Sequence, residues 1–192
     1  SKAEGIAKTY MAHNIALVSV ETGTNKIRAY VGNSDYNDEE HGGKVDMAQA
    51  PRQPGSSFKP IVYGAAFEKG YGPATVLYDV PTKIGTDEPQ NFDGGFWGLM
   101  DARRALGASR NIPAIKAFYL AGGEDGVLDF ASRLGASSPV EQKEKLGANF
   151  EYGWPLSLGA GETPLTQMVN AYATYANGGV YKPLVSIERI KD

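Results

Sequence analysis

The sequence predicts an α/β fold in which one β-hairpin precedes several helices. Residues 15–20 and 26–31 are rich in β-forming side chains, and a turn containing Gly and Asn separates them. Over residues 56–178, apolar side chains recur mostly at helical spacing between Gly and Pro breaks. Of the 192 residues, 42% are hydrophobic and 21% are charged. This composition indicates a globular chain and excludes a disordered or fibrous one.

The hairpin at about residues 15–31 needs a covering partner, because an isolated two-stranded ribbon is marginal in water. Its apolar side chains, among them Leu17 and Val20, require a helix or further strands against them. The acidic, Gly-containing residues 34–43 show no periodicity, and we expect a surface loop there.

The first helix is predicted at about residues 56–69. Phe58 and Val62 lie one turn apart on its apolar face, and Gly70 ends the pattern. Pro60 is compatible with this helix because it falls in the first turn, where the missing N–H costs little.

Shorter helices are expected further along the chain. Repeated Pro and Gly breaks make residues 71–95 an extended excursion, and helices follow at about residues 99–106, 112–120 and 125–134. Gly135 is expected to close the last of these as the residue after its C-cap.

The final helix has the strongest pattern. Thr163 is predicted as its N-cap and Pro164 as its first residue, and an apolar face then continues to Ala176. Residues 180–190 are predicted to leave this helix as an extended segment.

Charge and composition narrow the function classes. The chain has 19 basic and 22 acidic residues, a net charge of −3, which offers no broad basic surface for nucleic acid. It has no cysteine, which excludes a thiolate nucleophile or a cysteine zinc site. Its longest apolar runs, such as residues 15–20, are too short to span a bilayer, so we expect a soluble piece of a larger protein.

Ser56 and Lys59 form the most distinctive motif, within Arg52-Gln-Pro-Gly-Ser-Ser-Phe-Lys-Pro60. Three residues apart at the start of a helix, their side chains can meet on one face. A nucleophilic Ser needs a base, and a Lys kept neutral by its surroundings can serve as that base. Taken alone, the pair is more often a Ser N-cap beside a solvated Lys, since Ser-x-x-Lys is frequent by chance.

A second motif, Ser109-Arg-Asn111, lies in a predicted loop between two short helices, where alone it indicates a helix cap. Together the two motifs are similar to those of penicillin-recognising serine acyltransferases. The chain resembles class A penicillin-binding proteins, the bifunctional peptidoglycan synthases, over nearly its whole length. Further segments that resemble the transpeptidase domain of this family are Asp79-Val-Pro81, Pro89-Gln-Asn91 and residues 105–116, 156–165 and 170–179.

The resemblance implies a penicillin-binding/β-lactamase-like transpeptidase fold, an antiparallel sheet flanked by helices with a largely helical lobe. Residues 1–192 would then be a partial transpeptidase domain, with the hairpin at about 15–31, a mostly helical part at about 56–178, and the C-terminal sheet strands absent.

The resemblance also implies a D,D-transpeptidase. Ser56 would attack the carbonyl between the two terminal D-alanines of a peptidoglycan stem peptide, and an amine of a neighbouring stem peptide would take the acyl group. Lys59 would be the acylation base, Ser109 would relay the proton towards the leaving nitrogen, and Asn111 would bind the substrate backbone. The backbone N–H of Ser56 would form half of the oxyanion hole, and β-lactams would be trapped on Ser56.

One family motif is missing. No Lys-Thr-Gly follows Ser109, and the near miss Lys83-Ile-Gly-Thr86 precedes it, so we interpret Lys83 as a surface loop residue. The resemblance places the missing motif on a strand after Asp192. We therefore expect residues 1–192 alone to be inactive, to expose an apolar sheet edge, and to need that downstream segment of the same domain as a partner.

Two other functions stay open: a serine β-lactamase or D,D-carboxypeptidase of the same superfamily, and a non-catalytic module that binds β-lactams or a partner. The first ranks lower because no separate carboxylate is evident as a deacylation base. The resemblance further implies the extracytoplasmic face of the bacterial cell membrane, with membrane contact only through regions outside these residues, and no cofactor.

No metal site is expected, because His13 and His41 have no other ligand at metal-binding spacing and are interpreted as exposed imidazoles. Phe92, Phe96 and Trp97 either border a substrate cleft or pack within loops, and packing is the more frequent outcome.

Overall fold

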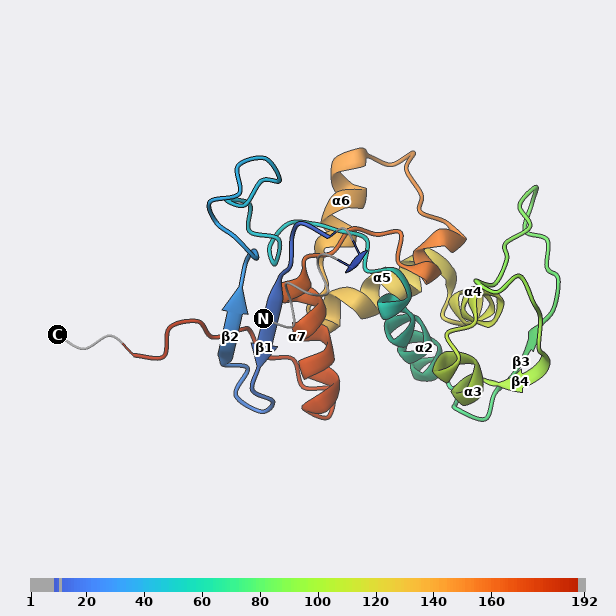
Figure 1. Ribbon diagram of the computed structural model, residues 1–192. Helices are drawn as coiled ribbons and strands as arrows, with labels where there is room; N and C mark the ends of the chain where they lie inside the picture. Colours follow the sequence, from blue (N-terminus) through green and yellow to red (C-terminus); the bar gives the residue numbers. More distant parts are fainter. Residues whose placement is uncertain (1–8, 11, 190–192) are drawn as a thin grey trace. The chain divides into compact units, whose positions relative to one another are not determined.

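The computed structural model describes residues 9, 10 and 12–189, and its elements confirm a mixed helix and sheet chain (Figure 1). They are β1 (Leu17–Val20), β2 (Ile27–Val31), the 3-10 helix η1 (Gly55–Phe58), α2 (Lys59–Glu68), β3 (Val76–Asp79), β4 (Gly98–Asp101), α3 (Ala102–Gly107), α4 (Asn111–Leu120), α5 (Gly123–Leu134), α6 (Ser138–Leu146), the 3-10 helix η2 (Trp154–Leu158) and α7 (Leu165–Ala176).

The chain divides into two units, and each is described by itself. The first contains the segments up to residue 52, residues 132–139 and the segment from residue 162 onward. The second contains residues 53–131 and 140–161.

In the first unit, β1 and β2 form the predicted antiparallel hairpin. Leu17 pairs with Val31 at one end and Val20 with Ile27 at the other, and a bulge interrupts the register beside Val20. Helix α7 packs against β1 and so supplies the cover that the hairpin requires (Figure 1).

The hairpin turn ends in a fully buried residue, Asn25, whose backbone takes the left-handed conformation with φ +55°. Its Nδ2 donates to Asn170 Oδ1 on α7 at 2.9 Å and to the carbonyl of Lys182 at 2.7 Å. Its Oδ1 accepts a hydrogen bond from Asn177 Nδ2 at 2.9 Å. This asparagine cluster (Asn25, Asn170 and Asn177) therefore ties the turn to the middle of α7 and to its C-cap.

The segment predicted to be extended after α7 forms one isolated bridge rather than a full strand. Val185 N donates to the Asn25 carbonyl at 2.9 Å, and Ile27 N donates to the Val185 carbonyl at 3.0 Å. The bridge runs parallel to the start of β2. The last residue of the predicted segment, Ile190, lies outside the described residues.

The N-cap of α7 was predicted one residue too early. Pro164 occupies the N-cap position, and no side chain caps the helix. Thr163 instead forms an isolated bridge with Arg52. Its backbone N–H donates to the Arg52 carbonyl at 2.9 Å. At the end of α5, Gly135 has φ +103°, as predicted for the residue after a C-cap.

In the second unit, the prediction of a helix at residues 99–106 was wrong at its start, and the predicted extended excursion at 71–95 contains the strand β3. Strand β4 pairs with β3 in an antiparallel ribbon, which buries Leu77 and Met100 on one face. Helix α3 begins only at Ala102. Asp101 is its N-cap, and the Asp101 side chain accepts a hydrogen bond from the backbone N–H of Arg104 at 2.7 Å. Pairing with a distant strand outweighed the local helical spacing.

The core of the second unit forms where α4 packs against α2, η2 and β3. Helices α2 and α4 agree with the predicted ones, although the first turn before α2 is a 3-10 helix. Two helices were not predicted, α6, which has few apolar positions, and the 3-10 helix η2. The large buried apolar side chains include Phe58, Ile61, Ile112, Ile115 and Leu156. Within the residues that the structure covers, every helix is too short or too polar to cross a membrane.

Substituting Asn25→Gly tests the asparagine cluster. Glycine adopts the left-handed backbone without cost, so the change removes only the side-chain hydrogen bonds. Three groups lose their bond to Asn25, and one of them is the amide oxygen of the buried Asn170. We expect the free energy of opening of the β1–β2 ladder, measured by hydrogen exchange, to fall by about 2–4 kcal/mol. The control Thr22→Gly, at an exposed position of the same turn, should change it by less than about 0.5 kcal/mol. Equal losses in the two variants would contradict a structural role for the cluster.

Candidate active site

Lys59, the first residue of α2, is the buried centre of the candidate site. Its side chain is 1% exposed, and its Nζ donates to the Ser109 carbonyl at 2.6 Å, to Asn111 Oδ1 at 2.7 Å and to Ser109 Oγ at 3.2 Å. Lys59 thus contacts two of the other three residues predicted from the sequence, and all of these lie in the second unit.

The fourth residue, Ser56, lies on η1, directly before α2, and its side chain is exposed. Its carbonyl accepts a hydrogen bond from the backbone N–H of Lys59, which is the spacing of a 3-10 turn. Side chains three residues apart in such a turn lie one above the other. Ser56 and Lys59 therefore share one face, although no hydrogen bond joins their side chains in the part of the chain that the structure describes.

The surroundings of Lys59 disfavour its charged form. Burial, and secondly the positive charge of Arg110, lower the pKa of Lys59 from 10.5 to about 8. Near neutral pH a fraction of these side chains is then uncharged, which an arginine at the same position could not achieve.

Ser109 has an unusual backbone, with φ +53°. For a residue other than glycine, the left-handed region costs about 1–2 kcal/mol. The turn is closed by Ser109 N, which donates to the Leu106 carbonyl at 2.9 Å, and by Arg110 N, which donates to the Ala105 carbonyl at 3.0 Å. This conformation brings the Ser109 carbonyl and hydroxyl to the same amine.

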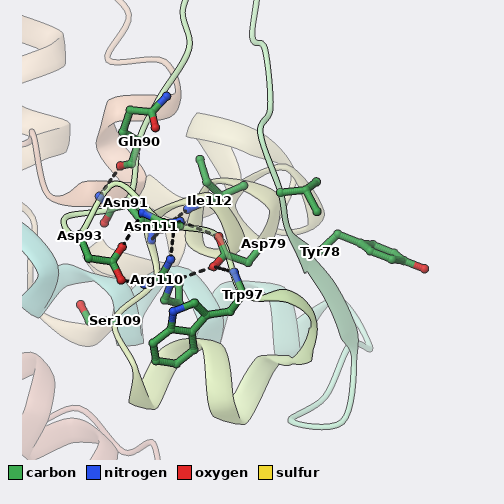
Figure 2. Close-up of polar contacts among 12 residues, drawn as sticks. Tyr78, Asp79, Gln90, Asn91, Asp93, Trp97, Ser109, Arg110, Asn111 and Ile112 are labelled. Carbon is green, nitrogen blue, oxygen red and sulfur yellow. Dashed lines mark hydrogen bonds and ion pairs between the residues drawn. The ribbon is translucent and has the colours of Figure 1, made fainter.

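Arg110, the middle residue of the second motif, is buried and pairs with the fully buried Asp79 (Figure 2). Asp79 Oδ2 accepts from Arg110 Nε at 2.8 Å and from the Trp97 N–H at 3.0 Å. Asp79 Oδ1 accepts from Asn91 Nδ2 at 2.7 Å. Three donors thus satisfy one buried carboxylate, as burial of a charge requires.

The far side of the Arg110 guanidinium is also occupied. Its Nη1 lies 2.8 Å from Asp93 Oδ2, and its Nη2 donates to the Gly95 carbonyl. The guanidinium lies over the Trp97 ring, 4.5 Å from its centroid, so Trp97 packs on a cation in this loop. The hydrogen bond from Arg110 holds the pKa of Asp93 below its usual value.

Asn91 connects these contacts to the start of α4. Its Oδ1 accepts from the backbone N–H of Asn111 at 2.8 Å and of Ile112 at 3.4 Å, so it caps the helix from a distant segment. Asn111 Nδ2 donates to the Gln90 carbonyl at 2.9 Å. With its nitrogen placed there, the amide of Asn111 presents its oxygen to Lys59. We call Asp79, Asn91, Asp93, Trp97 and Arg110 the Arg110 network.

Sequence reasoning placed Trp97 at a substrate cleft or within packed loops, and it assigned no role to the other residues of this network. Asp79, Asn91 and Arg110 lay inside segments noted only for their resemblance to a family. The available signal was an arginine in the middle of the Ser-x-Asn motif, whose charge has to be paired if the motif lies against a core.

One of the two histidines is not the exposed imidazole that the sequence predicted. His41 is half-buried, its Nδ1 lies 2.9 Å from Asp38 Oδ2, and its ring stacks on that of His13 with the centroids 3.6 Å apart. Only His13 is exposed as predicted. Across residues 9, 10 and 12–189, no group of three or more His, Cys, Asp or Glu side chains is arranged to hold a metal ion. Lys83 is exposed, as predicted for a loop residue.

A close backbone contact fixes the turn before Ser56. Gly159, the C-cap of η2, has φ +81°, and a Cβ there would overlap the backbone carbonyl, nitrogen and carbon of Gly55. The glycine thus lets η2 approach the chain one residue before Ser56.

Residues 15–192 match the family described as "Penicillin binding protein transpeptidase domain". The chain is 34% identical to penicillin-binding protein 1C of Escherichia coli K12 over 168 residues, which is 86% of this chain. It is 35% identical to penicillin-binding protein 1A of Neisseria flavescens over 185 residues, which is 92% of this chain. In each case it spans 21% of the length of the relative.

Two solved structures share the fold. The crystal structure of penicillin-binding protein 1A from Haemophilus influenzae has a TM-score of 0.77 and 36% identity, and the match covers 93% of this chain and 26% of that one. The PonA1 protein of Mycobacterium tuberculosis in complex with penicillin V has a TM-score of 0.77 and 29% identity, covering 94% and 49% of the two chains.

The contact of Gly159 with Gly55 predicts different effects for two matched substitutions. Gly159→Ala and Gly147→Ala both place alanine at a positive φ, but nothing lies within 4 Å of a Cβ at Gly147. Because only Gly159→Ala also overlaps a neighbouring backbone, we expect it to lower the free energy of opening of η1 and α2 by about 1–3 kcal/mol more than Gly147→Ala does. Hydrogen exchange of the η1 and α2 amides measures this difference, and equal effects would refute the contact.

Proposed function

Since the chain belongs to the transpeptidase domain of class A penicillin-binding proteins, we propose that it carries the serine acyltransferase centre of a D,D-transpeptidase that cross-links peptidoglycan stem peptides. The observation that carries this proposal is the buried Lys59 amine, which contacts Ser109 and Asn111 one 3-10 turn after an exposed Ser56.

The proposed first step acylates Ser56. Its Oγ attacks the carbonyl carbon of the amide between two D-alanines, and its proton passes to the neutral Nζ of Lys59. The carbon–nitrogen bond then breaks, and the leaving D-alanine amine receives a proton from Lys59 through the Ser109 hydroxyl. Lys59 is neutral again at the end of the step, and the acyl group is an ester on Ser56.

The second step repeats this chemistry with another nucleophile. An amine of a neighbouring stem peptide attacks the ester carbonyl and loses a proton to Lys59, while Ser56 Oγ leaves and recovers its proton. Asn111 Nδ2, which donates one hydrogen to the Gln90 carbonyl, has a second hydrogen for the substrate backbone. The backbone N–H of Ser56 would stabilise the oxyanion in both steps.

The setting of the reaction is part of the proposal. The relatives with which the chain shares its family are bacterial penicillin-binding proteins, and a peptidoglycan substrate places the centre on the outer side of the cytoplasmic membrane. β-Lactams are proposed to acylate Ser56 in the same way, a reading that the neighbour containing penicillin V supports. Because the chain covers about a fifth of its relatives and has no Lys-Thr-Gly after Ser109, activity is to be measured in the full-length protein.

Mass spectrometry of the full-length protein with benzylpenicillin tests the proposal. We expect the mass of one whole penicillin on Ser56, and no adduct in Ser56→Ala, whose exposed position predicts an unchanged fold by circular dichroism. The control Ser57→Ala, at the adjacent exposed residue, should keep the adduct. An adduct on Ser57 or Ser109 would overturn the assignment. Rapid release of hydrolysed penicillin would indicate a β-lactamase, and non-covalent binding alone would indicate a binding module.

The pH dependence of penicillin acylation tests Lys59 as the base. Because the pKa of Lys59 is lowered to about 8, the acylation rate should rise as pH increases through about 8, where the amine loses its proton. Lys59→Arg should slow acylation nearly as much as Lys59→Ala, by about 10²–10⁴-fold, since arginine stays protonated. A Lys59→Arg variant that kept most of the rate would show that positive charge, not basicity, is the contribution of Lys59.

A further inference from the structure

We propose that Arg110 is a positioning residue, which acts through the Arg110 network to hold the three oxygen atoms that fix the Lys59 amine. This proposal rests on the proposed function, because its consequence for rate requires Lys59 to act on Ser56. The placement of Lys59 itself can be tested without any reaction.

The chain order makes Arg110 the common support of these oxygens. Two belong to Ser109, directly before Arg110, and the third belongs to Asn111, directly after it. The Arg110 side chain extends into the group of Asp79, Asp93 and Trp97, which it contacts directly (Figure 2). One anchored side chain therefore fixes the backbone on both of its sides.

The strained turn needs such an anchor. Ser109 in the left-handed region persists only if its neighbours determine the conformation from several directions. On one side, the guanidinium reaches Asp79 and Asp93 at 2.8 Å each. On the other, Asn91 links the same Asp79 carboxylate to the backbone N–H of Asn111.

A lysine cannot replace this arginine. The planar guanidinium donates in several fixed directions at once, and here it binds two carboxylates and a carbonyl while it stacks on an indole. A lysine ammonium keeps the charge but is a single point that cannot span both carboxylates. The network therefore predicts a requirement for arginine geometry and not only for a cation. The charge of Arg110 adds to this role, since it contributes to the lowered pKa of Lys59.

The experiment compares Arg110→Lys with Arg104→Lys in the full-length protein. Arg104 is a matched control, because its guanidinium also lies over Trp97, at 5.6 Å, but it is exposed on α3. Stopped-flow acylation by a fluorescent penicillin separates the dissociation constant of the non-covalent complex from the first-order acylation constant. We expect Arg110→Lys to lower the acylation constant by about tenfold to a hundredfold and the dissociation constant to change less than about threefold, with Arg104→Lys near wild type.

A second variant guards against loss of folding. Asp93 is 48% exposed in its side chain, so Asp93→Asn removes one arm of the network without opening the core. We expect it to lower the acylation constant by about threefold to tenfold. A double variant with Arg110→Lys should lose less than the product of the two single effects, because both act through one ion pair.

Lysine Nζ NMR supplies a readout that needs no reaction. The three hydrogen bonds of Lys59 should give its ammonium protons at pH 6 slow exchange with water, which Arg110→Lys should abolish and Arg104→Lys should retain. If wild type is acylated on Ser56 and Arg110→Lys reacts as fast as Arg104→Lys, or keeps the protected signal, the positioning role is overturned. If wild type is not acylated on Ser56, the proposed function fails, and the NMR signal alone decides whether Arg110 places Lys59.

Discussion

The ion pair between Arg110 and Asp79 is the interaction on which the second unit depends most. Two charges taken out of water cost several kcal/mol unless every donor and acceptor is satisfied, and removal of one partner strands the other. Asp79 accepts from the side chains of Arg110 and Asn91 and from the Trp97 backbone, so the strand, the following loop and the turn before α4 meet at one carboxylate. A buried pair of this kind contributes less to overall stability than apolar packing of the same volume, but it permits only one arrangement of the segments that meet there.

The features that the sequence predicted well are those encoded by neighbouring residues. The hairpin and the closing Gly135 follow from local backbone preferences, and Ser56 and Lys59 share a face because a single helical turn separates them. The errors arose where distant residues decide. Strand β4 carries helical spacing but pairs with β3, and Thr163 pairs with Arg52 instead of capping α7. The contact of Lys59 with Ser109 and Asn111 could be inferred only from resemblance, and the anchoring by Asp79 and Asn91 not at all, because both depend on residues 20 or more positions away.

The two units share one structural feature at the places where distant segments meet. Each contains a non-glycine residue in the left-handed region, Asn25 in the first and Ser109 in the second, and each of these lies at a junction of segments distant in sequence. Around Asn25 the partners are two amides and a carbonyl, which are neutral, whereas beside Ser109 they include a buried ion pair. A neutral cluster joins a turn to a helix without bringing a net charge into the interior. The ion pair beside Ser109 also places the Arg110 cation near Lys59, where it contributes to the lowered pKa of the Lys59 amine.

The asparagine cluster has a consequence for the chemical lifetime of the chain. Asn177 precedes glycine, and in a flexible peptide the glycine nitrogen attacks such a side-chain amide, which releases ammonia through a cyclic imide. Here the Asn177 amide is fixed at both ends, by Gly23 N at 2.5 Å and by Asn25 Oδ1 at 2.9 Å, while Gly178 N donates to the Tyr175 carbonyl at 3.1 Å. The attacking nitrogen and its target are both engaged elsewhere, so deamidation has to wait for local opening of this corner. Once it occurs, the new carboxylate cannot donate to Asn25, and the damage prevents the corner from closing again in its original form.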